Sequence, residues 1–448
     1  MLRVAMTACS RLALVLMLTR CSVQAPDYAG KSCEAGACPG GYFCDAPSDT
    51  CRVAESQAAF VDTTFSGSFS RTRVTPEGEL ALADGQVEGT FISQVFDAGS
   101  KVRWESIAWV PLGAYGRQLP DLGAIEKSDG WLPASMTDNV LLLHMDGSEP
   151  RVDGQQLLDS SGRNNHAIVV SPLRFVEGRF GQAIADTRDS YAYVDLAKTK
   201  DFDFGTEDFT WALWVKTAQD CTGNKVHLGL DDGPADTPHL WLGCATGGHA
   251  GGTFADRQSA ASEVSLSGKT TINDNRWHHL ALVKKGHAGT TLKLFVDGQC
   301  EDVESGSFAT PITYVTGPQL AIGAFSGGGD QYQAEGSFDE VAIWRRALGE
   351  EEIRALYLRG ALRLAFQVRT CADLACWHAS PFVGPANSLT AFFVDESDGS
   401  HAEVQASLSG MESSRFIQYR TVLSSDALPP LWEGPRVRSV TLAPLGQD

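Results

Sequence analysis

The chain has 448 residues, of which 43% are hydrophobic and 20% charged, and its formal net charge is −19. That length suffices for two or three domains, each with its own hydrophobic core. A chain this acidic would repel the phosphates of nucleic acid, so we expect no nucleic-acid partner.

The first twenty residues are typical of a secretory signal peptide. Arg3 and Arg11 flank an apolar run, residues 12–18, that is too short to span a bilayer, and no later segment is a candidate to do so. Removal of residues 1–20 takes away three arginines and no acidic residue, so the charge of the mature chain falls from −19 to −22. We therefore expect an exported protein.

Cys21 decides between two forms of export. The residues before it, Leu-Thr-Arg, resemble a bacterial lipobox, in which the mature chain begins with a lipidated cysteine, although arginine is a poor residue just before the cleavage point. A lipidated Cys21 would make the chain a lipoprotein of the outer membrane or cell surface, and that lipid would be its contact with the membrane. Without lipidation the protein would be secreted.

Residues 21–53 form a predicted cysteine-rich knot. Four cysteines crowd among glycine and proline in a segment too short for a core, and an exported chain can form disulfides. A zinc site is the alternative, but the segment lacks paired C-x-x-C spacing and a nearby histidine. We predict two disulfides among Cys33, Cys38, Cys44 and Cys51.

The next segment, residues 60–130, alternates strand patterns with turns. Paired strands are predicted at residues 90–100 and 102–112, with weaker ones at 65–74 and 79–83. About four strands are too few to stand alone, so this segment is expected to be half of a β-sandwich.

A strand covered on both faces is predicted at residues 338–344. The run is apolar except at Asp339 and Glu340, as expected in a sandwich interior. The alternation of a strand then places Asp339 on the same face as Val341 and puts Glu340 on the opposite face.

A short amphipathic helix is predicted after this strand. Ile353, Leu356 and Tyr357 fall at helical spacing, and the three glutamates 350–352 occupy the first turn. Gly360 is expected to end the helix in a left-handed conformation.

These residues and five earlier segments closely resemble one family. The segments are DNVLLLHMDGSE (138–149), DSSGRNNHA (159–167), FTWALWVKT (209–217), RWHHLALVKKG (276–286), TLKLFVDGQ (291–299) and the closing tract GSFDEVAIWRRALGEEEIRALYLRG (336–360). They follow the order found in laminin-G-like jelly rolls of the concanavalin A-like lectin/glucanase superfamily, in their bacterial secreted form. The resemblance spans residues 136–360 and implies an all-β jelly-roll sandwich.

Residues 361–448 again carry strand patterns, at 362–371, 388–394, 415–423 and 436–444. Together with residues 60–130 they resemble an accessory β-sandwich of bacterial secreted proteins, with a Phe-Asp-Ala-Gly strand early and a Phe-Ile-Gln-Tyr-Arg strand late. We expect the jelly roll to be inserted into this second sandwich, because insertion at a loop costs little closure entropy. Three independent consecutive domains are the alternative.

Five cysteines follow the knot. Cys221 and Cys244 bracket a predicted hairpin, and Cys371 and Cys376 bracket a short loop, so each couple is a candidate disulfide. Cys300 is then left without a partner.

Enzymatic activity is not expected. Retaining glycanases of this fold carry a Glu-x-Asp-x-x-Glu strand, because two carboxylates must flank the scissile bond about 5 Å apart, and the chain has no such segment. Asp339 and Glu340 are predicted to point in opposite directions. His278 and His279, adjacent on a strand, cannot chelate one ion and are expected to be structural. A diverged glycanase is the least favoured interpretation.

The family resemblance implies a calcium site where the first and last strands lie side by side. Carboxylate and amide oxygens suit Ca²⁺, and the candidate ligands by position are Asp146, Asp159, Asn165 and Asp339. Asp159 and Asn165 have an alternative role in turn chemistry, in which they bond to their own backbone. The carboxylate of Asp339, on an apolar strand, needs a cation or several donors.

A sugar ligand needs exposed aromatic side chains beside polar groups. His239, Trp241 and Tyr332 lie near predicted loops and are candidates, whereas six tryptophans within strand patterns are expected in the core: Trp104, Trp109, Trp211, Trp214, Trp277 and Trp344. We predict a non-catalytic recognition or adhesion protein that binds polysaccharide or glycoprotein through the jelly roll. A structural or protein-interaction module of the envelope is the alternative.

Overall fold

The computed structural model describes residues 31–32, 42–45, 50–53, 58–147, 149–186, 190–204, 206–231, 239–255, 263–286, 290–306, 319–325, 331–376, 380–396, 401–427 and 433–447. The chain divides into two compact units, residues 1–56 with 446–448, and residues 57–445. The smaller unit holds antiparallel strands β1 (Tyr42–Asp45) and β2 (Thr50–Val53), in which Cys44 lies opposite Cys51 in register. Cys21, Cys33, Cys38 and the predicted signal peptide lie outside the described residues.

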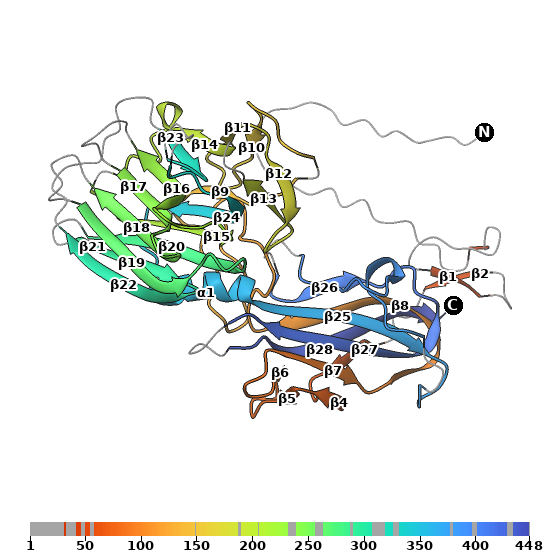
Figure 1. Ribbon diagram of the computed structural model, residues 1–448. Coiled ribbons are helices and arrows are strands. Elements are labelled where there is room, and N and C mark those ends of the chain that lie inside the picture. Colours follow the sequence, from red (N-terminus) through yellow and green to blue (C-terminus); the bar gives the residue numbers. More distant parts are fainter. Residues whose placement is uncertain are drawn as a thin grey trace, which may run out of the picture. The chain divides into compact units, whose positions relative to one another are not determined.

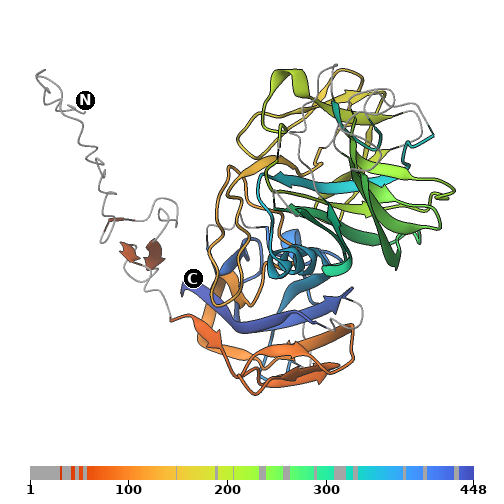
Figure 2. The ribbon, with the colours of Figure 1, turned by 90° about the vertical axis from the view of Figure 1, so that its left-hand side faces the viewer.

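The larger unit contains a jelly roll and a second β-structure built from both of its flanks, which we call the accessory sandwich (Figures 1 and 2). Its early strands are β3 (Phe60–Asp62), β4 (Gly67–Ser70), β5 (Thr72–Val74), β6 (Leu80–Leu82), β7 (Glu88–Ser93) and β8 (Phe96–Pro111). Its late strands are β25 (Leu362–Cys371), β26 (Val404–Ser407), β27 (Ser414–Ser425) and β28 (Arg436–Gln447).

Early and late strands alternate within the accessory sheet. Strand β27 pairs with β7, β8 and β25, while β8 also pairs with β26, so neither flank forms this sheet alone. In Figure 2 the early strands, in orange, and the late strands, in blue, lie side by side. The jelly roll therefore interrupts the accessory sandwich, and long-range pairing between its flanks holds the two ends of the insertion together.

The accessory core is rich in aromatic side chains. Trp104 and Trp109 of β8 are fully buried, and the Trp109 ring stacks on Phe366 of β25 with centroids 4.5 Å apart. Tyr419 of β27 donates to the Asp62 carboxylate at 2.7 Å, which satisfies its buried hydroxyl.

The predicted boundary between two early strands is wrong. The strands expected at 90–100 and 102–112 are β7 and β8, which divide at residues 94–95. The chain near residue 101 continues as one strand because residues 98–101 form a bulge, with Gly99 at φ 74° and the register to β27 jumping from Asp97 to Val102.

The strand predicted at residues 388–394 is also absent. Phe393 makes one isolated bridge to Phe366, and the Ser388 hydroxyl accepts the backbone N–H of Ala391 at 3.0 Å. Such local side-chain bonds compete with ladder formation. Strand β26, at residues 404–407, pairs with β8 instead.

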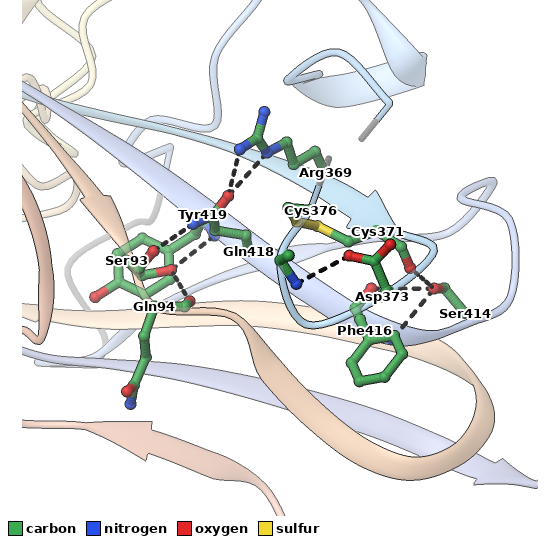
Figure 3. Close-up of a disulfide and its surroundings, with 11 residues drawn as sticks. Ser93, Gln94, Arg369, Cys371, Asp373, Cys376, Ser414, Phe416, Gln418 and Tyr419 are labelled. Atoms are coloured by element: carbon green, nitrogen blue, oxygen red, sulfur yellow. Dashed lines mark hydrogen bonds between the residues drawn. A yellow bond between two sulfur atoms is a disulfide. The ribbon is translucent and has the colours of Figure 1, made fainter. Parts of the chain in front are cut away.

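The Cys371–Cys376 disulfide closes the loop at the end of β25 (Figure 3). Beside it, the Ser414 hydroxyl donates to the Cys371 carbonyl at 3.2 Å, and Arg369 donates from Nε to the Gln418 amide oxygen at 2.9 Å. The loop is therefore fastened to the neighbouring strand β27.

The jelly roll consists of two antiparallel sheets. The first, in spatial order, is β10 (Gln156–Leu157), β11 (Ala167–Val170), β14 (Tyr191–Asp195), β23 (Gln319–Ile322), β16 (Lys225–Asp231), β17 (His239–Cys244), β18 (His249–Ala255) and β19 (Glu263–Thr271). The second is β12 (Arg174–Glu177), β13 (Gln182–Asp186), β24 (Gly336–Trp344), β15 (Phe209–Lys216), β20 (Trp277–Lys285), β21 (Thr290–Val296) and β22 (Gln299–Gly306), with β9 (Asn139–Leu143) also on β24.

The two sheets enclose one apolar core. Strand β24 is buried on both faces, as expected, and so is β15. The inner side chains of both strands enter this core, while their outer side chains are covered by other elements. The Cys221–Cys244 disulfide is present at the start of β16 and the end of β17, and Cys300 of β22 is a free, exposed cysteine.

Helix α1 (Glu350–Ala361) covers the outer face of the second sheet. Its residues Ile353 and Leu356 pack with Trp344 and Phe295, and Glu352 bonds back to the N–H of Gly349 at 2.9 Å. Two short 3₁₀ helices are also present, η1 (Leu196–Lys198) after β14 and η3 (Pro385–Asn387) between β25 and β26. The described part of the chain holds no helix long and apolar enough to cross a membrane.

Gly360 does not end the helix as predicted. It lies within α1, which runs directly into β25 (Figure 1). A β-carbon at this position would stand 2.4 Å from Trp214, so glycine is required by close packing rather than by a left-handed turn.

Candidate functional site

A bulge in β24 places two carboxylates on one face of the sheet. Phe338 and Val341 both enter the inner core, and Glu340 between them has a positive φ of 47°. The extra residue opposite β15 reverses the alternation. The prediction that Asp339 shares a face with Val341 and opposes Glu340 is therefore wrong: both acidic residues lie on the outer side.

Asp339 and Asp146 hold the turn between β12 and β13. One carboxylate oxygen of Asp339 accepts the backbone N–H groups of Arg179 and Phe180 at 2.7 and 2.9 Å. Asp146 accepts the N–H of Gln182 at 2.7 Å. The sequence prediction that Asp339 needs a partner is met by backbone donors.

The charge state of this acidic pair is unusual. Burial raises the pKa of Asp339 well above its ordinary value, and the adjacent Glu340 carboxylate raises it further. Glu340 accepts the N–H of Leu119 at 3.0 Å and bonds to Nδ1 of His144, whose Nε2 lies 2.8 Å from Asp121. Burial alone would lower the pKa of His144, but these carboxylates raise it to about 10, so the imidazolium balances Glu340.

Asp159 and Asn165 follow the alternative role of turn chemistry. Asp159 accepts the backbone N–H groups of Leu142, Ser161 and Asn165 at 2.8–2.9 Å. The Asn165 amide donates to the carbonyl of Val140 at 2.8 Å. Both side chains fasten the DSSG turn to the opening strand.

The four predicted calcium ligands form hydrogen bonds within the protein. Each carboxylate already accepts two or more hydrogen bonds from the protein. Among the residues that the structure describes, no group of three histidine, cysteine or acidic side chains is placed to hold a metal. Calcium at these residues stays a prediction from the sequence.

The three predicted sugar contacts lie on the outer side of the first sheet. Trp241 of β17 is only 5% exposed and packs with Val226 and Phe325. Phe325 contacts Tyr332 edge-on, with centroids 5.4 Å apart. The indole of Trp241 therefore lacks the exposed surface expected from the sequence, whereas His239 and Tyr332 are half-buried.

His278 and His279 have separate structural surroundings, as predicted. His278 lies between Asp297 and Asp274, at 2.8 and 3.0 Å, and these carboxylates raise its pKa although burial opposes them. Burial lowers the pKa of His279 to about 4, and its ring packs against Trp214.

A sizeable cavity lies between the jelly roll and the accessory sandwich. This junction cleft has a volume of about 690 Å³, within the range of small-molecule sites. Its apolar lining includes Trp131 and Leu132 from the segment before the jelly roll, Leu358 of α1, and Leu82 and Leu112 of the accessory side. Trp131 is half-buried, and its indole nitrogen has no hydrogen-bond partner.

Ion pairs hold the polar lining of the junction cleft in place. Arg354 of α1 bonds to Glu433, and Arg346 bonds to Glu352 at 2.8 Å. Arg436 of the lining donates to the buried carboxylate of Glu79 at 3.0 Å. The cleft thus combines one half-buried indole with charged groups that are held by ion pairs.

Comparison with known proteins identifies the central segment. Residues 188–354 match the family model described as the concanavalin A-like lectin/glucanases superfamily. This segment is a concanavalin A-like jelly roll. No curated protein matches the chain significantly.

Several solved structures are similar to part of this chain. The binding domain of Paraclostridial Mosquitocidal Protein 1 is 16% identical over 52% of this chain and 58% of its own, with a TM-score of 0.38. Domain 4 of AbnA, a GH43 extracellular arabinanase from Geobacillus stearothermophilus, in complex with arabinotriose, is 17% identical over 49% of this chain and 98% of its own, with a TM-score of 0.37. The CBM40 of Ruminococcus gnavus IT-sialidase bound to α2,3-sialyllactose is 19% identical over 39% and 96%, with a TM-score of 0.33.

The junction cleft could not be predicted from the sequence, because its walls come from distant segments. Residues 73–86 and 433–436 of the accessory sandwich meet α1 of the jelly roll there. One signal was available: Trp131 follows Ser-Asp-Gly outside any strand pattern, so it was a better candidate for an accessible aromatic side chain than Trp241 within a strand.

Proposed function

We propose that this protein is an exported, non-catalytic carbohydrate-binding protein, whose jelly roll and accessory sandwich together bind a polysaccharide or the glycan of a glycoprotein in the junction cleft. The observation that carries the proposal is Trp131, a half-buried indole that lines a cleft of about 690 Å³ beside charged side chains held by ion pairs. Sugar rings present C–H groups that stack on an aromatic face and hydroxyls that bond to polar groups around it.

The family match supports a sugar as the ligand class. The superfamily matched by residues 188–354 takes its description from lectins and glucanases. Fold alone does not name a ligand, so the choice of the junction cleft rests on its lining. Attachment to the cell surface through Cys21, or secretion without it, belongs to the same proposal.

Two observations favour binding over hydrolysis. A glycosidase needs one carboxyl with a raised pKa to protonate the leaving group. In the junction cleft, hydrogen bonding to its own backbone lowers the pKa of Glu77, and Arg346 lowers that of Glu352 despite partial burial. Asp339, whose pKa is raised, and its neighbour Glu340 are both buried. The cavity beside Glu340 has a volume of about 10 Å³, which is too small for a sugar.

The test is a glycan array probed with the full chain, with Trp131→Ala and with His239→Ala. We expect glycan binding by the wild type and by His239→Ala, and its loss in Trp131→Ala. Retention in Trp131→Ala with loss in His239→Ala would move the ligand to the outer face of the first sheet. The absence of any glycan signal from the wild type would count against carbohydrate binding.

A protein-interaction module is the second candidate. Leu122 and Leu158 are 77% and 66% exposed. The backbone N–H of Leu122 donates to the carbonyl of Ser160 at 2.8 Å. The segments that carry Leu122 and Leu158 are therefore neighbours. These exposed leucines favour this candidate, because contiguous exposed apolar patches mark sites of protein interaction.

A further inference from the structure

A second cleft between the jelly roll and the accessory sandwich has a basic lining. We call it the basic cleft, and its volume is about 340 Å³. Lys216 lies at the end of β15, Arg276 lies just before β20, and Arg363 lies in β25. Two of these cations therefore come from the jelly roll and one from the accessory sandwich.

These three cations form no ion pair with a described side chain, although the charge of Arg276 acts on the carboxylate of Asp274 beside the cleft. The other charges of the lining are mostly paired. Arg179 donates to Asp426 at 2.7 Å, and Asp297 accepts from His278 at 2.8 Å. Glu177 is the remaining acidic group of the lining and forms no ion pair with a described side chain. Three unpaired positive charges thus face one unpaired negative charge.

The positive charge of the basic cleft changes the pKa of Arg179, the buried arginine of its lining. Burial lowers the pKa of Arg179, and the charge of Arg363 lowers it further. The Nε atom of Arg179 is buried without a hydrogen-bond partner. In a chain whose net charge is −19, this local excess of positive charge attracts anions that the rest of the surface repels.

The size and the lining of the basic cleft suit a sugar ring. Trp277 is half-buried and lines the cleft, and it is the direct cross-strand neighbour of Lys216. An indole beside a cation offers a stacking face next to a charge. A volume of about 340 Å³ is at the lower end for ligand sites, which limits the ligand to one or two rings.

We propose that the basic cleft binds an acidic sugar residue, whose carboxylate or sulfate is held by Arg363, Arg276 and Lys216 while its ring lies against Trp277. This inference rests on the proposed function in that the ligand is a glycan, but it names a different site and an anionic class of sugar. Arginine forks match carboxylate and sulfate oxygens, and such charge-assisted bonds are the stronger kind. Since Arg363 belongs to the accessory sandwich, the site is complete only when both domains are present.

The experiment measures binding of glucuronate, glucose 6-sulfate and glucose to the full chain by calorimetry. Glucose has the same ring without the anionic group, so it isolates the contribution of charge. We expect both anionic sugars to bind, glucose to bind at least tenfold more weakly, and the affinity for glucuronate to fall as sodium chloride is raised. Equal affinity for glucose and glucuronate would overturn the proposal.

Variants locate the site. Arg363→Gln and Arg276→Gln should each weaken glucuronate binding about tenfold, the loss of one charge-assisted contact. Arg103→Gln is the matched control, because Arg103 is an exposed arginine of β8 that does not line the basic cleft. Unchanged melting temperatures establish that the variants fold. Wild-type affinity in both cleft variants would refute the assignment.

Two further results separate this inference from the proposed function. If Trp131→Ala abolishes binding of neutral glycans but leaves glucuronate binding intact, both sites stand as assigned. If the wild type binds anionic sugars but no neutral glycan, the assignment of the junction cleft fails and that of the basic cleft is supported.

Discussion

Arg359 of α1 lies against Glu126, with Nη1 2.9 Å from Oε1, and both side chains are buried. Arg117 continues this contact, with Nη2 2.6 Å from Asp395 of the accessory sandwich. These four charges connect the helix, the segment before the jelly roll and a late loop. They fix the relative positions of the elements that line the junction cleft.

Removing the carboxylate of Glu126 should destabilise the larger unit. Glu126→Gln leaves Arg359 buried without its counter-charge, which costs about 3–5 kcal/mol. Burial alone would raise the pKa of Glu126, but Arg359 lowers it below its ordinary value, so its stabilising contribution is present above the unfolded-state pKa and is lost as pH falls through the folded-state pKa. Urea unfolding should show a much lower free energy of unfolding for Glu126→Gln than for the wild type at pH 7. This difference should become smaller at acidic pH. Glu412→Gln, at an exposed site, is the control.

The protonated state of His144 should make stability depend on alkaline pH. Its pKa is raised to about 10 from an ordinary value near 6.5, so its contribution is full below the ordinary pKa and is lost as pH rises through about 10. His144→Gln removes a charge-assisted bond to buried Glu340 and should cost about 2 kcal/mol at pH 7. The melting temperature of the wild type and of the control His239→Gln should decrease as the pH is raised from 6.5 to 10. A decline of the same size in His144→Gln would argue against this assignment.

Much of the fold follows from the sequence because its patterns are local. The apolar run of β24 and the helical spacing of α1 predict both elements. The face on which each side chain lies follows from the alternation of the strand or the period of the helix. The bulge at Glu340 was not predictable in this way, because one residue with positive φ reverses the faces without changing the composition of the strand.

The candidate sites were harder to predict because they depend on contacts between domains. Arg363 and Lys216 are ordinary strand-end cations in the sequence, and their shared cleft exists only after β25 and β15 are packed together. Trp241 shows the reverse case. It was expected to be exposed because it lies near predicted loops, but its side chain packs with Val226 and Phe325.

The two described disulfides should differ in their contribution to stability. Cys221–Cys244 spans 23 residues and Cys371–Cys376 spans five, and a longer closed loop restricts the unfolded chain more. In a Cys300→Ser background, serine at both positions of the first pair should cost about 3 kcal/mol, and serine at both positions of the second about 2 kcal/mol. Urea unfolding of the two double variants measures the difference. A larger loss of stability on removing Cys371–Cys376 than on removing Cys221–Cys244 would show that loop length does not determine how much each disulfide stabilises the protein.

Metal removal should have little effect on the jelly roll. Asp146, Asp159 and Asp339 bond to backbone N–H groups, so these carboxylates are stabilised without an ion. We expect the melting temperature in EDTA to agree with that in millimolar Ca²⁺ within about 1 °C, with Mg²⁺ as the ionic control. A rise of several degrees with Ca²⁺, abolished by Asp339→Asn, would instead support the calcium site implied by the family resemblance.

Gly360 should be intolerant of substitution although it lies in a helix. Alanine normally stabilises a helix by about 1 kcal/mol relative to glycine. Here a β-carbon would lie 2.4 Å from the ring of Trp214, which is buried and stacked on Tyr357, so the ring has little room to move. Gly360→Ala should therefore lose about 1–3 kcal/mol through overpacking. Gly349→Ala is the matched control, because the nearest atom to its added carbon is 3.7 Å away. Urea unfolding should show the larger loss for Gly360→Ala, and a gain in stability there would mean that Trp214 can shift and that α1 is less tightly packed on the jelly roll than the contact indicates.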